Sequence, residues 1–110
     1  LKLTMPASVF SRSTESHNQD KVSMGTLSAR EALRILELSE TVAVVHLLAL
    51  SQAVDLRGVE RCHARSRALR DAVRREVPRN DADRRMDGDI AVVLARYRAG
   101  ALPIGEVDFP

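Results

Sequence analysis

The stretch VAVVHLLALSQAVDL, residues 42–56, decides the fold of this chain. Eleven of its fifteen residues are apolar, and on a helix they would surround the axis instead of forming one stripe. A helix that is apolar on every side has to be buried on every side. The rest of the chain has too little apolar material for this. We therefore expect packing partners from a longer parent chain or from other subunits.

Capping signals mark both ends of a longer helix, residues 26–58, that contains this stretch. Ser28 and Glu31 have the spacing of a capping box, and Thr26 is an alternative N-cap. Gly58 lies where a C′ glycine would end the helix. A helix of about thirty residues would measure roughly 45 Å at 1.5 Å per residue. A break near residues 39–41 is an open alternative.

A second, amphipathic helix is predicted over residues 61–77. Its apolar residues Leu69, Val73 and Val77 repeat at four-residue steps, and Pro78 follows them. Such a helix would bury one face and leave the other in water.

A third helix is predicted from about residue 88 to residue 99. Asp87 can cap its start, and Gly100 ends it. Its apolar face would hold Ile90, Val93, Leu94 and Tyr97.

These elements predict an all-α fold in three parts. Residues 1–25 form a lead-in and a polar loop, residues 26–58 a long buried bundle helix, and residues 59–110 the C-terminal helices and tail. All three are expected to be one segment of a larger helical domain. The start at Leu1 instead of a methionine also suggests a piece of something longer.

The composition excludes several classes of protein. Cys62 is the single cysteine, which excludes an internal disulfide framework and a cysteine-based zinc site. A reducing, cytoplasmic setting fits best. No signal peptide is visible, and the most apolar window is too short to cross a bilayer. We therefore expect no metal and no membrane contact.

Nine arginines lie between Arg61 and Arg85. A phosphate-binding helix is one interpretation of this run. However, acids such as Asp71 and Glu76 are interspersed with the positive charges, and no aromatic residue interleaves for base stacking. A solvated face with ion pairs is the favoured interpretation, and we expect no nucleic-acid partner.

A polar cluster, STESHNQDKVSMGT, precedes the long helix at residues 13–26. Glu15 can act as an acid or a base. Asn18 and Gln19 offer hydrogen-bond donors and acceptors but do not titrate. On chemistry alone, the cluster is either a polar loop with helix caps or one wall of a binding pocket. No nucleophile, metal-ligand set or phosphate loop accompanies it.

The same residues carry a family resemblance. PASVFSRSTESHNQDKVSMGT, followed by SAREALRILEL and LLALSQAVDLRG, resembles the C-terminal part of aromatic amino acid ammonia-lyases and aminomutases. These enzymes use a methylidene-imidazolone (MIO) prosthetic group, and the histidine ammonia-lyases are their relatives. RRMDGDIAVVLARYRAGAL resembles the closing helix of bacterial members.

The resemblance implies a mostly helical homotetramer whose long helices pack into a central bundle. Its active sites are built from several subunits. MIO forms from an Ala-Ser-Gly tripeptide, which does not occur in this chain. The family's tyrosine base and its arginine for the substrate carboxylate also lie upstream. The 110 residues alone are therefore expected to be inactive.

By resemblance, Glu15 lies close to the substrate amine and the prosthetic group and is the catalytic residue of this segment. Asn18 contacts the substrate or the prosthetic group, Gln19 supports the same wall, and His17 and Asp20 orient the loop. Histidine ammonia-lyases tend to have a carboxylate where Gln19 stands, and a neutral amide suits a phenyl or phenol ring better. The expected reaction is elimination of ammonia from L-tyrosine or L-phenylalanine to give a trans-arylacrylate.

Other functions stay open. An aromatic aminomutase, which returns the amine to the β-carbon, is the first alternative, and a histidine ammonia-lyase is the second. A helical assembly module without catalysis and an arginine-rich nucleic-acid binder are alternatives from other classes. An Ala-Ser-Gly tripeptide upstream in the parent protein would favour the enzymes over the assembly module and the nucleic-acid binder.

Overall fold

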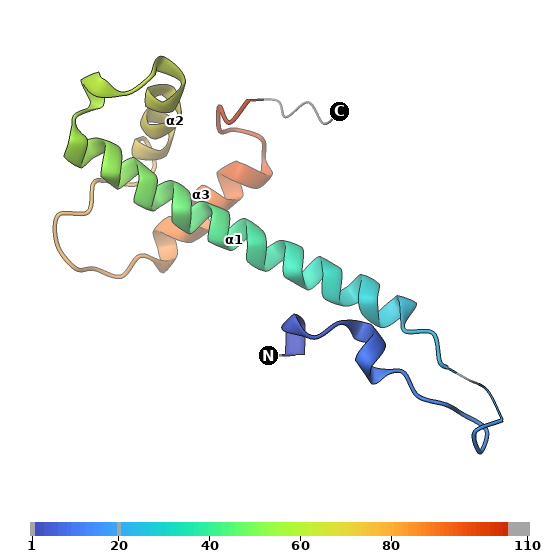
Figure 1. Cartoon of the computed structure of the whole chain (residues 1–110). Coiled ribbons are helices and arrows are strands. Elements are labelled where there is room, and N and C mark those ends of the chain that lie inside the picture. The colour runs from blue at the N-terminus through green and yellow to red at the C-terminus, as the bar shows by residue number, and fades with distance from the viewer. Residues whose placement is uncertain (1, 20, 106–110) are drawn as a thin grey trace. The chain divides into compact units, whose positions relative to one another are not determined.

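The computed structural model describes residues 2–19 and 21–105. Figure 1 shows the regular structure of this part as helical. Its α-helices are α1 (Gly25–Arg57), α2 (Ala64–Arg74) and α3 (Asp87–Arg98). Its 3-10 turns are η1 (Lys2–Thr4), η2 (Ala7–Phe10) and η3 (Val59–Arg61). The all-α prediction is confirmed for the described residues.

The chain divides into two compact units, residues 1–39 and residues 40–110. The first unit holds η1, η2, the polar loop and the start of α1. The second holds the rest of α1 with η3, α2 and α3. Each unit is described by itself below.

Helix α1 is one unbroken helix of 33 residues. The break considered near residues 39–41 does not occur, and the Ser39 hydroxyl donates to the Ile35 carbonyl at 2.9 Å within the continuous helix. The predicted capping box at Ser28 is also wrong. The Ser28 N–H already donates to the Met24 carbonyl at 2.8 Å, so Ser28 lies inside the first turn.

The C-terminal end of α1 follows the prediction at Gly58. This glycine has φ 97°, and its N–H donates to the Val54 carbonyl at 3.1 Å. The left-handed conformation turns the chain out of the helix and into η3. The turn is what brings α2 back toward α1.

Replacing Gly58 with Ala in the full-length protein is expected to lower the free energy of unfolding by about 1 kcal/mol, because a Cβ strains this conformation. The added Cβ would also meet the Glu60 side chain. Gly88→Ala is the matched control, because Gly88 has an ordinary φ and a Cβ added there would meet no other side chain within 4 Å. Urea denaturation of both variants measures the difference. Equal losses would contradict this role of Gly58.

Helix α2 is shorter than the helix predicted over residues 61–77. It begins at Ala64 because His63 is its N-cap, with Nδ1 accepting from the Arg65 N–H at 3.3 Å. It ends at Arg74, and the following turn carries the buried Val77. Of the residues that the sequence pattern placed in the helix, Arg61 belongs to η3, and residues 75–77 form the turn after Arg74.

Helix α3 starts at Asp87, which is therefore not the cap that the sequence predicted. Met86 occupies the N-cap position and makes no side-chain cap hydrogen bond. The Asp87 carboxylate accepts instead from Arg85, from Nε at 2.5 Å and from Nη2 at 2.8 Å. The hydrogen bonds from Arg85 hold the pKa of Asp87 below its usual value.

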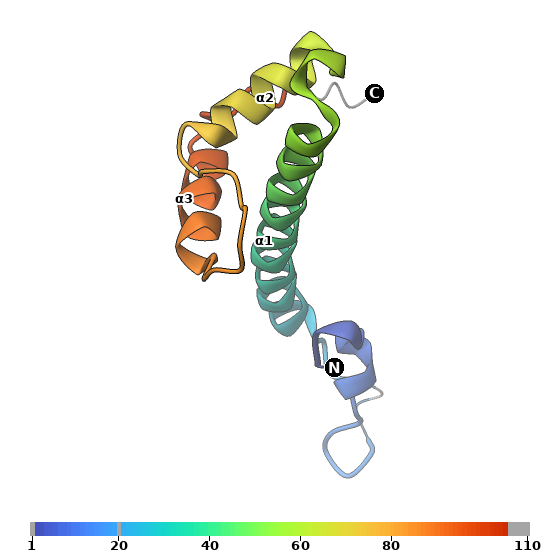
Figure 2. The ribbon, with the colours of Figure 1, turned by 90° about the vertical axis from the view of Figure 1, so that its left-hand side faces the viewer.

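The core of the second unit lies where its three helices meet. Figures 1 and 2 show α2 and α3 on the same side of the second half of α1. The buried apolar cluster is aliphatic throughout, in keeping with a chain that has three aromatic residues. Its members are Val44, Leu48, Val73, Val77 and Val93.

Much of the apolar surface of α1 is exposed in this chain. Leu33, Leu50 and Leu56 are each about two-thirds exposed, at 65%, 64% and 67%. Within α1, burial is limited to the face that carries Val44 and Leu48. The helix predicted to be buried on every side therefore buries one face here, and the other faces are available to surfaces outside these 110 residues.

Candidate functional site

The predicted site residues lie on a small hairpin in the first unit. The Thr14 N–H donates to the Gln19 carbonyl at 2.8 Å, and the Gln19 N–H donates back at 3.4 Å. Across the tip, the Asn18 N–H donates to the Glu15 carbonyl at 2.9 Å. The hairpin is the loop that precedes α1 at the lower right of Figure 1.

Polar contacts also close the base of the hairpin. The Val22 N–H donates to the Arg12 carbonyl at 3.2 Å, and the Ser11 hydroxyl donates to the Val22 carbonyl at 2.7 Å. Nearer the tip, the Ser13 hydroxyl and His17 Nδ1 share a hydrogen bond. Hydrogen bonds thus hold the two sides of the hairpin together both at its base and nearer its tip.

Left-handed backbone forms the tip. Glu15, Ser16 and His17 have φ values of 51°, 53° and 68°, and none of them is glycine. Ordinary side chains adopt this region at a cost, although histidine does so more often than most. Sequence reasoning missed this feature because the usual signal for such a tip, an Asn-Gly or Asp-Gly pair, is missing from it.

The three residues expected to face the substrate are open to solvent. Glu15, Asn18 and Gln19 are all exposed. Their side chains have no hydrogen bond or ion pair to any other residue that the structure describes. Their polar groups are therefore available to a ligand. Asp20, predicted to orient the loop, lies outside the described residues.

A shallow cavity of about 590 Å³ lies near the hairpin in the first unit. It is formed by residues within 6–11 and 21–28, and Glu15, Asn18 and Gln19 do not line it. Its lining residues are Pro6, Ala7, Ser8, Ser11, Lys21, Val22, Met24 and Ser28. The first unit thus brings the three polar side chains to one hairpin but does not enclose a pocket around them.

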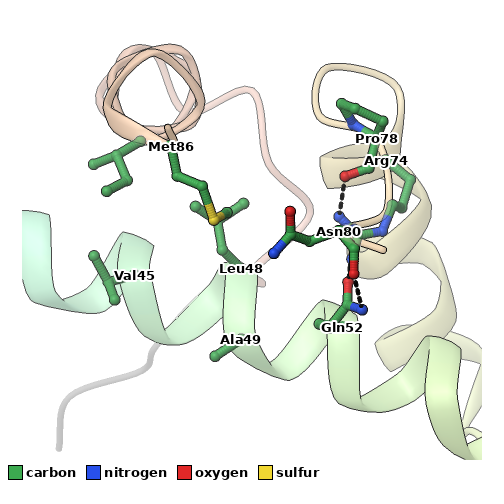
Figure 3. Close-up of a pocket in the computed structure, with 9 residues that line it drawn as sticks. Val45, Leu48, Ala49, Gln52, Arg74, Pro78, Asn80 and Met86 are labelled. Atoms are coloured by element: carbon green, nitrogen blue, oxygen red, sulfur yellow. Dashed lines mark hydrogen bonds between the residues drawn. The ribbon is translucent and has the colours of Figure 1, made fainter. Parts of the chain in front are cut away.

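A more apolar pocket of about 240 Å³ lies in the second unit, between α1 and the connector that precedes α3. Figure 3 shows the Met86 side chain and the Asn80 side-chain amide pointing into it beside Leu48. The Asn80 Oδ1 is buried and has no hydrogen-bond partner among the described residues. The walls offer no free acid or base, so the pocket does not resemble a reaction site.

The connector next to this pocket is held by a pair of amide contacts. Gln52 Nε2 donates to the Asn80 carbonyl at 2.8 Å, and the Asn80 N–H donates to Gln52 Oε1 at 3.1 Å (Figure 3). Arg74 Nη2 also donates to Gln52 Oε1, at 3.2 Å. One glutamine side chain thereby fixes an irregular segment to α1.

A buried carboxylate lies one helical turn beyond Gln52. The Asp55 side chain is 2% exposed and accepts from Arg74 Nε at 2.7 Å and from Arg70 Nε at 2.6 Å. Burial raises the pKa of Asp55, but the hydrogen bonds and positive charges of Arg74 and Arg70 outweigh it and leave the pKa lowered. The carboxylate is fully engaged by the two guanidinium groups, so its role is structural.

Many of the arginines after residue 60 are paired with acids. Arg79 bonds to Asp81 at 2.8 Å, and Arg84 bonds to Asp89. Together with the Asp55 and Asp87 pairs, these contacts agree with the predicted ion-paired face. Among the described residues, no group of three or more His, Cys, Asp or Glu side chains could hold a metal ion. None of the helices described combines the length and hydropathy that a membrane span needs.

Comparison with known proteins identifies the family. The family model described as "Aromatic amino acid lyase" matches residues 1–75. The chain belongs to this family. The predicted resemblance is thereby confirmed, and the match covers both the hairpin and the long helix.

The relatives of this lyase-family chain are named for different amino acids, histidine in one and tyrosine in another. The histidine ammonia-lyase of Natranaerobius thermophilus is 42% identical over 91 residues, which are 83% of this chain and 18% of that protein. The tyrosine ammonia-lyase of Cupriavidus metallidurans is 43% identical over 98 residues, 88% of this chain and 18% of that protein. The chain thus spans less than a fifth of the length of these relatives.

A solved relative supports the fold. The crystal structure of tyrosine aminomutase from Streptomyces globisporus matches with a TM-score of 0.72 and 41% identity over 86% of this chain and 18% of that chain. The same protein is also described as an MIO-dependent tyrosine 2,3-aminomutase. The helical arrangement found here is therefore that of a segment of a larger lyase-family fold.

Proposed function

We propose that this chain is the C-terminal part of an ammonia-lyase that eliminates ammonia from L-tyrosine or L-phenylalanine to give a trans-arylacrylate. The observation that carries the proposal is the hairpin, on which the side chains of Glu15, Asn18 and Gln19 are exposed together and have no partner among the described residues. The neutral amide of Gln19 favours a phenyl or phenol ring over the basic imidazole of histidine.

Each hairpin residue has its own part in the proposed reaction. The Glu15 carboxylate holds the substrate ammonium group and can take up or return its proton. The Asn18 amide donates and accepts hydrogen bonds without changing its charge, which suits orienting a substrate or a neutral group. Gln19 completes a polar, uncharged wall beside the aromatic ring.

The prosthetic group of the family fits this set of donors. Asn18 and Gln19 could hold a neutral heterocycle by donating to its carbonyl oxygen, because both side chains are exposed and have no partner in the described part of the chain. When bound, MIO supplies an electrophile that makes the amine a better leaving group. No serine in these 110 residues is followed by glycine, so the group would form in another part of the protein.

Assembly and location are also part of the proposal. A homotetramer, with helices of other subunits against α1, would cover side chains such as Leu33, Leu50 and Leu56. The single cysteine agrees with a cytoplasmic enzyme.

An aromatic aminomutase is the second candidate. It is favoured by the match to the tyrosine aminomutase structure, which has a TM-score of 0.72. Such an enzyme would hold the released amine and return it to the β-carbon, so Glu15 would have to keep the amine in place longer than in a lyase.

One assay separates these functions. The full-length protein is incubated with tyrosine, phenylalanine and histidine in turn, and the products are separated by chromatography. We expect coumarate or cinnamate. Urocanate alone would overturn the proposed substrate, and β-tyrosine or β-phenylalanine would move the assignment to the aminomutases.

A further inference from the structure

The tip of the hairpin is strained, because it contains no glycine to adopt its left-handed backbone without cost. Three consecutive residues that are not glycine, Glu15, Ser16 and His17, have positive φ values. Conformations of this kind persist only when surrounding contacts enforce them, and they cluster where function needs a fixed geometry.

The geometry of the tip explains why positive φ is needed. A short antiparallel hairpin closes best when both central residues of its turn have φ above zero, which favours Asn-Gly. Here the Asn18 N–H reaches the Glu15 carbonyl at 2.9 Å, and the two central residues are Ser16 and His17. This turn is therefore built from two residues that adopt positive φ less readily than glycine does.

Contacts outside the backbone of the tip hold it in this shape. The Ser13 hydroxyl bonds to His17 Nδ1 across the turn. Below it, the Thr14 and Gln19 backbones exchange two hydrogen bonds. The Ser13 hydroxyl thus bonds to the side chain of a left-handed residue, so removing this bond should loosen the tip.

We propose that this left-handed turn is a positioning device for the Glu15 carboxylate, and that Ser13 and His17 are the positioning residues that hold it. The proposal rests on the proposed function. Because the turn joins Glu15 to Asn18 through one backbone hydrogen bond, its shape sets the direction of the carboxylate relative to the amide. Ser13 and His17 act through the turn and need not touch the substrate.

Two variants of the full-length enzyme separate the shape of the turn from the imidazole itself. His17→Leu removes the bond to Ser13 and puts a poorly suited residue at positive φ. The double variant Ser16→Asn/His17→Gly also removes the imidazole but supplies the Asn-Gly pair that prefers this turn. Arg12→Leu is the control, because Arg12 is an exposed residue of the same hairpin without positive φ.

The measurements are kcat, KM and the dissociation constant of the arylacrylate product, the last by calorimetry. We expect His17→Leu to lower kcat by roughly 10–100-fold, because displacing a reacting group costs rate steeply. Product affinity should stay within about twofold of wild type, because the product has no amine for Glu15 to hold. The double variant should recover kcat to within about threefold of wild type, and the Arg12→Leu control should stay within the same range.

Each other outcome is decisive. If His17→Leu has wild-type kcat, the turn does not position Glu15. If the double variant is as slow as His17→Leu, the imidazole acts directly and the positioning role is overturned, while the proposed function stands. If His17→Leu loses product binding together with kcat, the site has collapsed as a whole, and the specific positioning of Glu15 by His17 is overturned. A wild-type enzyme that forms neither an arylacrylate nor a β-amino acid would overturn the proposed function and this role with it.

Discussion

Glu15→Gln in the full-length enzyme is expected to lower kcat by roughly 10²–10⁴-fold, the usual cost of losing a general acid or base. Glutamine keeps the shape of the side chain but cannot hold or release the proton of the substrate amine. Glu15 is exposed and has no partner in the described part of the chain, so the substitution breaks no contact of the fold described here. The readout is the rate of arylacrylate formation, followed by its absorbance.

The control for this variant is Glu60→Gln, because the Glu60 side chain is 76% exposed and lies on η3. It should leave kcat unchanged. Asn18→Ala is the companion variant, and it should lower kcat by about tenfold or more through loss of an orienting amide. Both site variants should elute as the same oligomer as wild type in size-exclusion chromatography. Full activity in either one would show that its residue is wrongly assigned.

Asp55→Ala is expected to cost about 3–5 kcal/mol of stability, the typical loss when one partner of a buried ion pair is removed. The carboxylate is 2% exposed and lies between Arg70 and Arg74, whose side chains are 25% and 12% exposed. Without it, two guanidinium groups face each other in a poorly solvated place. Urea denaturation of the full-length protein, followed by circular dichroism, should show an earlier transition.

The ion pairs of Asp55 with Arg70 and Arg74 also make the stability of the protein depend on pH, with a sign that follows from the pKa of Asp55. Because the folded-state pKa of Asp55 is lowered, its stabilising effect is complete above the unfolded-state value of about 3.9. The effect is lost as the pH falls from there toward the folded-state pKa. The stability difference between wild type and Asp55→Asn should therefore be constant near neutral pH and shrink below about pH 4.

Asp81→Ala is the matched control for the buried carboxylate. Asp81 pairs with Arg79, but its side chain is 71% exposed, and such surface pairs contribute about 0–1 kcal/mol. A loss at Asp81 equal to the loss at Asp55 would show that burial is not what makes the Asp55 cluster important.

The helices were predictable because they follow from local signals. The apolar residues of residues 42–56 and the glycine at position 58 fixed α1 to within a residue or two of its ends. The starts of α2 and α3 were less predictable, because they depend on competition between neighbouring caps. His63 displaced the expected start of α2, and the pairing of Asp87 with Arg85 took away its predicted role as a cap.

The contacts that hold distant residues together were not predictable from spacing. Asp55 lies 15 and 19 positions before its arginine partners, and Gln52 lies 28 positions before Asn80. Nothing local distinguishes these residues from ordinary polar ones. The left-handed tip was not predictable either, since Ser16 and His17 lack the Asn-Gly or Asp-Gly signal of a turn with positive φ. The roles of Glu15, Asn18 and Gln19 rest on the resemblance and stay predictions.

The double amide contact between Gln52 and Asn80 has a practical consequence for engineering this protein. It anchors the connector on one side, and Met86, packed against the core, anchors it on the other. Between these anchors, residues 81–85 are all exposed, Ala82 and Asp83 among them. An epitope tag or a fluorophore-bearing peptide inserted between Ala82 and Asp83 would disturb neither the Gln52–Asn80 contact nor the packing of Met86. The connector is thus a suitable attachment point for a label.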